Sequence, residues 1–253
     1  MTSYLSKNKN EFKALILAGG RGKRLDKYTK DENKCMLKFH GKPLIEYSLE
    51  KSLDMGVKEI IIVVGYLAEN IINYYGNNYK GIIIKYVIQK EQKGLVNAID
   101  IARKSIENSD FFLLLGDEFF LQTEHDKLIE LFYKENAMGV CGMIEVEDKS
   151  QINKTYSILF DQDSKKIFRL VEKPKNPFNN LMGTGNVLFN NKILDYIKMT
   201  PINQNRKEAE LPDLIQCAID DGKKIFYYTL SSVYVNINTS EDITILNKEI
   251  KIR

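Results

Sequence analysis

Three basic residues follow a glycine-rich turn near the start of the chain, in the run LILAGGRGKRL at residues 15–25. Glycine lets backbone N–H groups approach a phosphate closely, and arginine and lysine bind phosphate oxygens. An acidic residue, Asp117, follows the apolar run FFLLL and Gly116. A carboxylate at the end of an apolar strand suits Mg²⁺, which prefers oxygen ligands. These residue types indicate a nucleotide site, with Asp117 as a candidate Mg²⁺ ligand.

The spacing of the glycines excludes two common nucleotide-binding motifs. Leu25 stands where the dinucleotide pattern G-x-G-x-x-G needs its third glycine. The ATP-binding P-loop needs a glycine five residues before Gly22 and a Ser or Thr after Lys23, but these positions are Leu17 and Arg24. We therefore expect a phosphate-binding turn of another class.

The apolar pattern around these residues predicts an α/β fold. Short apolar runs alternate with longer amphipathic stretches, which is typical of a doubly wound, mostly parallel, Rossmann-like central sheet. The strands expected in the first half are Lys13–Ala18, Glu59–Val64, Ile82–Ile88 and Phe111–Leu115. The helices expected between them are Pro43–Met55, Leu67–Tyr75 and Leu95–Ile106.

After about residue 138 the pattern changes, and we expect an antiparallel extension in the second half. The turn signal DQDSK separates Tyr156–Phe160 from Lys166–Val171 and predicts a hairpin or an antiparallel addition to the sheet. Further strands are expected at Met138–Glu145, Lys224–Leu230 and Val233–Asn236, and helices at Asn191–Met199, Glu210–Asp221 and Thr239–Lys248. We expect one domain over residues 1–253, with a polar extension (1–11), an NTP-binding half (12–137) and an acceptor-binding half (138–253).

Composition narrows the class of protein. The chain has 253 residues and a net charge of +3 from interspersed acidic and basic residues. Neither a nucleic-acid partner nor a membrane surface is indicated, because no basic block and no apolar run of about 18 residues occurs. The three cysteines (Cys35, Cys141 and Cys217) lack metal-ligand spacing, so we interpret them as reduced thiols in a cytoplasmic protein.

The run LILAGGRGKRL resembles the signature of the sugar-1-phosphate nucleotidylyltransferases, the enzymes that make nucleotide-activated sugars. The resemblance extends from Lys13 to about Asn247. The other segments that match the family's motifs are KCMLKFHGKPLIEYSLE (34–50), Gln89 with Gly94, LGD (115–117), VEKP (171–174), GTGNV (183–187), ELPD (210–213) and VNINTSED (235–242).

The resemblance implies transfer of a nucleoside monophosphate from an NTP to a sugar 1-phosphate, with release of pyrophosphate and with Mg²⁺ as cofactor. It also implies a role in nucleotide-sugar and cell-surface polysaccharide biosynthesis. The catalytic cations that it implies are Arg24 and Lys34 on the NTP and Lys173 on the acceptor phosphate. The nucleotide-binding residues are Leu17, Ala18, Gly19, Gly20, Gly22, Gln89, Gly94 and Asp117. The acceptor-binding residues are Glu172, Gly185 and Asn186, the last two in a glycine loop that faces the sugar, and the metal ligands are Asp117 and Asn236.

Several residues depart from the family's pattern. Asn236 stands where many members have a second metal-binding aspartate, and an amide oxygen can coordinate Mg²⁺ without adding charge. Asn33 and Cys35 flank Lys34 where prolines are common, and we expect a looser loop there. Glu118 follows Asp117 on a strand and should point to the opposite face, away from the metal.

Other functions stay open at this point. The acceptor could be a non-sugar phosphoester, such as a phospho-amino alcohol, which would give a CDP-linked product. The replacement of a frequent G-T-A by Gly94-Leu95-Val96 leaves the choice among CTP, dTTP, UTP and GTP open. A non-catalytic nucleotide-binding regulator is a further alternative, although it would usually lose the charged residues present here. His40 and His125 are expected in loops and outside catalysis, and the sequence leaves a homo-oligomer open.

Overall fold

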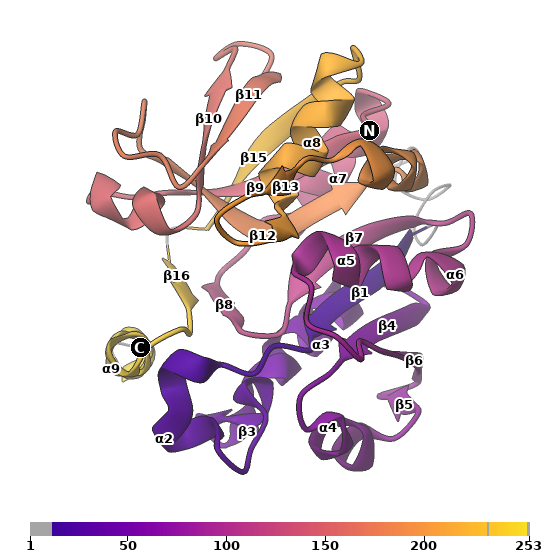
Figure 1. The fold of residues 1–253 in the computed structure, drawn as a ribbon, viewed down its shortest axis with the longest axis vertical. Helices are drawn as coiled ribbons and strands as arrows, with labels where there is room; N and C mark the ends of the chain where they lie inside the picture. Colours follow the sequence, from indigo (N-terminus) through magenta and orange to yellow (C-terminus); the bar gives the residue numbers. More distant parts are fainter. Residues whose placement is uncertain (1–11, 232, 252–253) are drawn as a thin grey trace.

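One eight-stranded sheet forms the centre of the computed structural model, which describes residues 12–231 and 233–251 and leaves the expected extension 1–11 outside. Its strands are β1 (Phe12–Ala18), β4 (Glu59–Val64), β5 (Asn78–Tyr79), β6 (Ile82–Ile88), β7 (Asp110–Leu115), β9 (Gly139–Glu145), β12 (Leu181–Phe189) and β15 (Ile225–Ser231). They lie in the order β15-β9-β12-β7-β1-β4-β6-β5 (Figure 1).

The sheet is mostly parallel, as predicted. Strand β1 pairs in parallel with β4 and β7, and β4 with β6. Strand β12 runs antiparallel between β7 and β9, while β15 pairs with β9 in parallel. The antiparallel member from the second half therefore joins both halves of the chain in one sheet.

The predicted hairpin forms but does not extend this sheet. Strands β10 (Tyr156–Phe160) and β11 (Ile167–Glu172) pair antiparallel in a two-stranded sheet of their own. The second half instead contributes an antiparallel strand to the main sheet through the GTGNV segment, which was expected as a loop and lies inside β12. Glycine permits this, because Cβ atoms at Gly183 and Gly185 would come within 2.2 Å of Tyr156 and Leu115.

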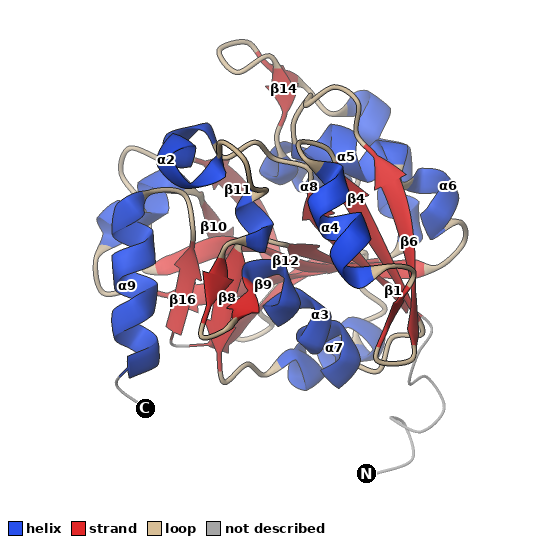
Figure 2. Ribbon diagram, turned by 90° about the horizontal axis from the view of Figure 1, so that it is seen from below, coloured by secondary structure: helices blue, strands red, loops and turns tan. Residues whose placement is uncertain are grey.

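Helices cover both faces of the sheet, which confirms the doubly wound architecture. One face carries α3 (Leu44–Asp54), α4 (Ala68–Tyr75) and α7 (His125–Lys134); the other carries α5 (Leu95–Ile101), α6 (Arg103–Ile106), the 3₁₀ helix η4 (Asn191–Met199) and α8 (Leu211–Asp220). Figure 2 shows α3 and α7 on one side and α5 and α8 on the other. Side chains of β1 alternate between the two cores, with Ile16 in the first and Leu15 in the second.

Two helix predictions differ from the structure. The helix expected over Leu95–Ile106 is divided at Ala102 into α5 and α6, and the segment Asn191–Met199 is a 3₁₀ helix. His125, expected in a loop, begins α7 and is buried. None of the helices within the described ranges is long and apolar enough to cross a bilayer.

Short elements assemble beside the carboxyl ends of β1 and β7. They are η1 (Lys23–Leu25), α2 (Asp26–Thr29), η2 (Lys34–Met36), β2 (Lys38–Phe39), β3 (Lys42–Pro43), β8 (Glu118–Leu121), β16 (Val233–Asn236) and α9 (Ser240–Lys251). The remaining short elements are η3 (Lys149–Lys154), β13 (Ile202–Asn203) and β14 (Glu208–Ala209). Strand β16 pairs antiparallel with β8, and Figure 1 shows β16 and α9 next to α2.

A third hydrophobic cluster holds η1, β2, β8, β16 and α9 together. Leu25 from the glycine turn, Phe119 from β8 and Ile237 after β16 pack in it, with Leu246 of α9. All four side chains are at most 2% exposed, and each stabilises the packing by about 1.5–3 kcal/mol. The cluster therefore fixes segments from both ends of the chain around the predicted site.

Candidate active site

The glycine turn and Asp117 lie at the ends of two adjacent parallel strands. The Gly116 N–H donates to the Leu17 carbonyl oxygen at 2.9 Å. The chain runs from β1 outward through β4 and β6 and then returns to β7 on the other side of β1. Open α/β sheets bind ligands at the point where the strand order reverses in this way.

The turn presents free backbone donors. The N–H groups of Gly20, Arg21 and Gly22 donate no hydrogen bond to any backbone or side-chain group that the structure describes. Gly22 has a φ of 65°, and a Cβ there would come within 3.1 Å of the Lys34 stem. Its lack of a side chain therefore permits both the left-handed turn and the approach of Lys34. Successive free amides of this kind bind phosphate oxygens.

The loop before Lys34 is held firmly, so the expectation of a looser loop is wrong. Asn33 is fully buried, and its N–H donates to the Asn70 Oδ1 at 3.0 Å. Its Nδ2 donates to the carbonyl oxygens of Ala18 and Tyr66 at 3.3 and 2.6 Å, and its Oδ1 accepts from the Cys35 N–H at 2.9 Å. Hydrogen bonds of a buried amide replace the rigidity that a proline would supply.

Four of the residues predicted from the sequence meet in one cluster. Lys34, which is 7% exposed, forms an ion pair with Asp117. The Arg24 Nη2 and the Lys34 Nζ both approach the Oδ1 of Asn238, at 3.2 and 3.4 Å. Asn236 lies beside them, because its Oδ1 accepts from the Asn238 Nδ2 at 2.8 Å. Asn238 was not among the predicted site residues.

The oxygens of Asp117 and Asn236 fit a Mg²⁺ ion. The N–H of Ile237 donates to the Asp117 carbonyl oxygen at 3.0 Å, which holds the two ligand-bearing segments side by side. Among the described residues no three His, Cys, Asp or Glu side chains group together as a metal site. Mg²⁺ usually takes one or two carboxylates and fills its remaining positions with substrate phosphates and water. The donor set is of that kind.

Gln89 lies across the turn from these charges. It is 8% exposed, and its Nε2 donates to the Asn97 Oδ1 at 3.0 Å and to the Gly94 carbonyl oxygen at 3.3 Å. Its Oε1 accepts from no described residue and faces Gly19, since a Cβ on that glycine would lie 3.0 Å from it. Gln89 therefore presents an acceptor to the turn.

The other predicted charges form a second group. Lys173 is paired with Glu172 at 2.9 Å and has a φ of 45°, with its N–H bonded to the Thr155 carbonyl oxygen at 2.6 Å. The Arg206 guanidinium forms ion pairs with three carboxylates. Its nearest nitrogen in each pair lies 3.4 Å from the Glu172 oxygen and 2.8 Å from the oxygens of Glu208 and Glu210. Glu210 was recognised only as part of a helix start and Arg206 not at all. No ion pair or hydrogen bond joins this group to Arg24 in the part of the chain that is described.

A buried network behind Asp117 was missed by sequence reasoning. Glu118 begins β8, while Asp117 lies in the turn before it, and the Glu118 side chain is in the interior, where it is 3% exposed. Its carboxylate accepts from the Tyr234 hydroxyl at 2.7 Å, and from the Gly185 N–H and the Asn186 Nδ2 at 2.9 Å each. Burial raises the pKa of Glu118 to about 7, against the lowering effect of these bonds. Gly185 and Asn186 thus have an interior partner, and their contact with the acceptor stays a prediction.

The network ends at His125. Because the Asn186 Nδ2 donates to Glu118, its Oδ1 faces the ring and lies 3.0 Å from the His125 Nε2. The Nε2 therefore carries the proton, and the Nδ1 has no partner among the described residues. Burial lowers the pKa of His125 to about 4, which keeps the ring neutral. Burial likewise raises the pKa of the Cys141 thiol to about 12.

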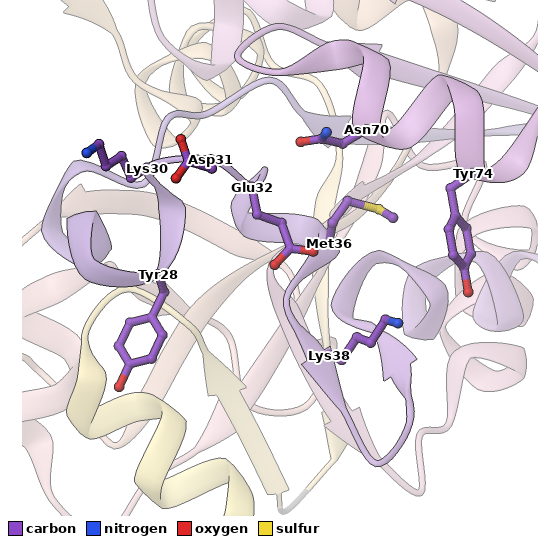
Figure 3. Close-up of a pocket in the computed structure, with 8 residues that line it drawn as sticks. All are labelled: Tyr28, Lys30, Asp31, Glu32, Met36, Lys38, Asn70 and Tyr74. Carbon is purple, nitrogen blue, oxygen red and sulfur yellow. The ribbon is translucent and has the colours of Figure 1, made fainter.

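A cavity of about 550 Å³ lies outside this cluster, between the loop that precedes Lys34 and α4. Figure 3 shows Asp31 and Glu32 on the loop and Asn70 and Tyr74 on the helix. None of its lining residues was predicted as a site residue. Two of them lie next to the site, because Asn70 accepts a bond from the Asn33 N–H and Met36 belongs to η2 with Lys34.

Free amides, two cations and a carboxylate at the switch point of a doubly wound sheet define a class of α/β enzymes that act on nucleoside triphosphates. The chain belongs to the nucleotidyl transferase family, whose sequence model matches residues 13–248. It therefore transfers nucleotidyl groups.

Particular relatives extend this comparison. The UTP–glucose-1-phosphate uridylyltransferase AglF of Haloferax volcanii is 31% identical over 229 residues, which cover 90% of this chain and 92% of that protein. The bifunctional protein GlmU of Methanococcus maripaludis is 32% identical over 83% of this chain, which spans 47% of its length. A UDP-glucose pyrophosphorylase in complex with UDP-glucose shares the fold, with a TM-score of 0.85, 24% identity and coverage of 96% of this chain and 99% of that one.

Proposed function

We propose that the enzyme transfers a uridylyl or thymidylyl group from UTP or dTTP to a sugar 1-phosphate, releasing pyrophosphate. The observation that carries the choice of nucleotide is the orientation of Gln89. Both hydrogens of its Nε2 are directed to Gly94 and Asn97, so the Oε1 is the group left to meet a base. An acceptor there suits the N3–H of uracil or thymine; cytosine has an acceptor at N3 and would have to present its N4–H₂ group instead. The relative AglF is a uridylyltransferase, which agrees with this choice.

The phosphates of the nucleotide would lie along the glycine turn. The free N–H groups of Gly20, Arg21 and Gly22 bind phosphate oxygens, and Arg24 and Lys34 add two positive charges. Nucleotidyl transfer depends on positioning and on neutralising charge in the transition state, which these residues provide. A Mg²⁺ ion held by Asp117 and Asn236 would act as a Lewis acid on the same phosphates.

The acceptor needs no general base from the protein. A sugar 1-phosphate is largely a dianion at neutral pH, because its second pKa is about 6. One of its oxygens attacks the α-phosphorus of the NTP, the bond from that phosphorus to the bridging oxygen breaks, and pyrophosphate leaves with the electron pair. This is consistent with the buried, neutral His125, which takes no part. Lys173, paired with Glu172, is proposed to hold the acceptor phosphate.

A pyrophosphate-release panel tests the proposal. It crosses UTP, dTTP, CTP, GTP and ATP with glucose 1-phosphate, N-acetylglucosamine 1-phosphate and phosphoethanolamine, with Mg²⁺ present. We expect turnover with UTP or dTTP and a sugar phosphate. Turnover restricted to CTP and phosphoethanolamine would replace the proposal with the non-sugar alternative, and no turnover in any combination would favour a non-catalytic regulator.

A further inference from the structure

Asn238 connects the two cations of the site to Asn236. Its Oδ1 accepts from the Arg24 Nη2 at 3.2 Å and from the Lys34 Nζ at 3.4 Å, and its Nδ2 donates to the Asn236 Oδ1 at 2.8 Å. One side chain from the C-terminal part of the chain thus contacts the glycine turn, the Lys34 loop and the end of β16.

The backbone that carries Asn238 is itself fixed. The N–H groups of Asn238 and Thr239 both donate to the Asp242 Oδ2, at 2.8 and 2.7 Å. The preceding residue, Ile237, is fully buried and bonded to the Asp117 carbonyl oxygen. A side chain on such a support can hold its partners in place before a ligand arrives, which lowers the entropy cost of binding.

The Asn238 side chain is neutral, and this matters for the charge on Arg24. Among the residues whose side chains the structure describes, Arg24 has no ion pair, and its guanidinium has the Asn238 Oδ1 as its one polar partner. An amide oxygen orients the guanidinium through one of its five N–H donors and leaves the charge uncompensated. A carboxylate at this position would pair with Arg24 and Lys34 and oppose the approach of a triphosphate.

The amide nitrogen of Asn238 acts on Asn236. It fixes which end of the Asn236 amide faces the cluster, so that the Oδ1 points toward Asn238 and the cations. An amide oxygen has two lone pairs, and this bond uses one of them. The other is available to a metal ion.

We propose that Asn238 is a positioning residue for the nucleotide's phosphates and for the metal, an inference that rests on the proposed function. Its Oδ1 orients Arg24 and Lys34 toward the phosphates without neutralising them. Its Nδ2 orients the Asn236 amide so that the Asn236 Oδ1 faces the metal. Asn238 itself contacts neither the reacting phosphorus nor the acceptor.

Two variants separate these effects from simple loss of structure. Asn238→Ala removes both the Oδ1 acceptor and the Nδ2 donor. Asn238→Asp keeps the shape of the side chain and the oxygen, but it adds a negative charge and removes the donor. Asn108→Ala, at an exposed position, is the matched control. Melting temperatures establish that each variant is folded, and the nucleotide is whichever of UTP and dTTP the wild type turns over.

The first measurement is calorimetric binding of that nucleotide in excess EDTA, where only the protein's own charges act. We expect Asn238→Ala to weaken binding about 10-fold, the effect of losing hydrogen bonds to charged groups. Asn238→Asp should weaken binding at least as much, despite its isosteric side chain. With Mg²⁺ present, the KM for the nucleotide should rise in both variants while the KM for glucose 1-phosphate stays within about twofold of the wild-type value.

The second measurement is Mn²⁺ binding by EPR with saturating nucleotide, which we expect Asn238→Ala to weaken. Asn238→Asp binding the nucleotide in EDTA as tightly as the wild type would contradict the proposal, because a merely structural asparagine tolerates an isostere. Wild-type behaviour of Asn238→Ala in both assays would also refute it. These outcomes differ from failure of the proposed function, in which the wild type itself would release no pyrophosphate from UTP or dTTP.

Discussion

Replacing His125 with glutamine should remove part of the protein's sensitivity to acid. The ring is 4% exposed, and burial lowers its pKa from 6.5 to about 4. A histidine with a depressed pKa contributes stability that is present above pH 6.5 and is lost as the pH falls toward 4, because the unfolded chain takes up the proton first. Glutamine keeps an N–H donor for the Asn186 oxygen but does not titrate in this range.

The size of the effect follows from the two pKa values. A pH of 5 is 1.5 units below the imidazole pKa of 6.5 in the unfolded chain, so the unfolded ring is almost fully protonated. The folded ring, with a pKa of about 4, is still mostly neutral. At about 1.4 kcal/mol per pH unit, His125 makes the wild type lose about 2 kcal/mol between pH 7.5 and pH 5. His125→Gln should lack this loss, whatever its stability at pH 7.5.

The assay is urea unfolding followed by circular dichroism at pH 7.5, 6 and 5. Other titrating groups act in both proteins, so their effects cancel in the difference to first order. His40→Gln, at an exposed turn, serves as the control and should keep the wild-type slope. If the wild type and His125→Gln lose equal free energy of unfolding between pH 7.5 and pH 5, the burial argument is refuted.

Three more substitutions test the role of Lys173 on the acceptor and the packing of Gly185. Lys173→Ala should lower kcat/KM for the sugar phosphate about 100-fold or more, because the variant loses the positive charge that binds the acceptor phosphate. The NTP dissociation constant should stay within about twofold of the wild-type value. An unchanged KM and kcat for the acceptor would count against this role. Gly185→Ala places a Cβ 2.2 Å from the Leu115 Cγ and should cost about 1–3 kcal/mol by overpacking, which thermal unfolding would measure. Gly20→Ala meets no atom within 4 Å and should unfold like the wild type; equal melting temperatures for both variants would contradict the packing argument.

The sequence predicts the central sheet and the glycine turn because their signals are local. Strands β1 and β4 are apolar on both faces, and a glycine turn directly follows β1, so the fold and the place of the phosphate site can be inferred together. Arg24 and Asp117 belong to runs whose composition already indicates phosphate or metal binding, whereas Lys34 was identified through the resemblance to the family's motif.

The residues that were missed depend on contacts between distant segments. Asn238 is 214 residues from Arg24, and its role follows only once β16 pairs with β8. Glu118 shows a different difficulty. Strand alternation does not relate it to Asp117, because Asp117 lies in the turn before β8, and alternation alone does not tell that Glu118 is interior and binds Asn186 and Tyr234.

The GTGNV segment was expected as a loop because it resembles the glycine loop of the family that faces the sugar. Here Gly183 and Gly185 make room for neighbouring side chains inside a buried strand. A glycine pattern alone cannot distinguish these two uses, because the crowding neighbours, Tyr156 and Leu115, come from other strands. The division of the domain into a nucleotide half and an acceptor half stays a prediction.

The central claim is that Asp117 works with Arg24 and Lys34 in one metal-dependent site for nucleotidyl transfer. The most direct test is pyrophosphate release by Asp117→Ala with the best NTP and sugar phosphate, across a Mg²⁺ titration, with the exposed Asp126→Ala as the control. We predict a loss of at least about 10³-fold, of the order found when a charge-stabilising group is removed, with a retained far-UV spectrum and cooperative unfolding. Mg²⁺-dependent release at the wild-type rate would contradict the account.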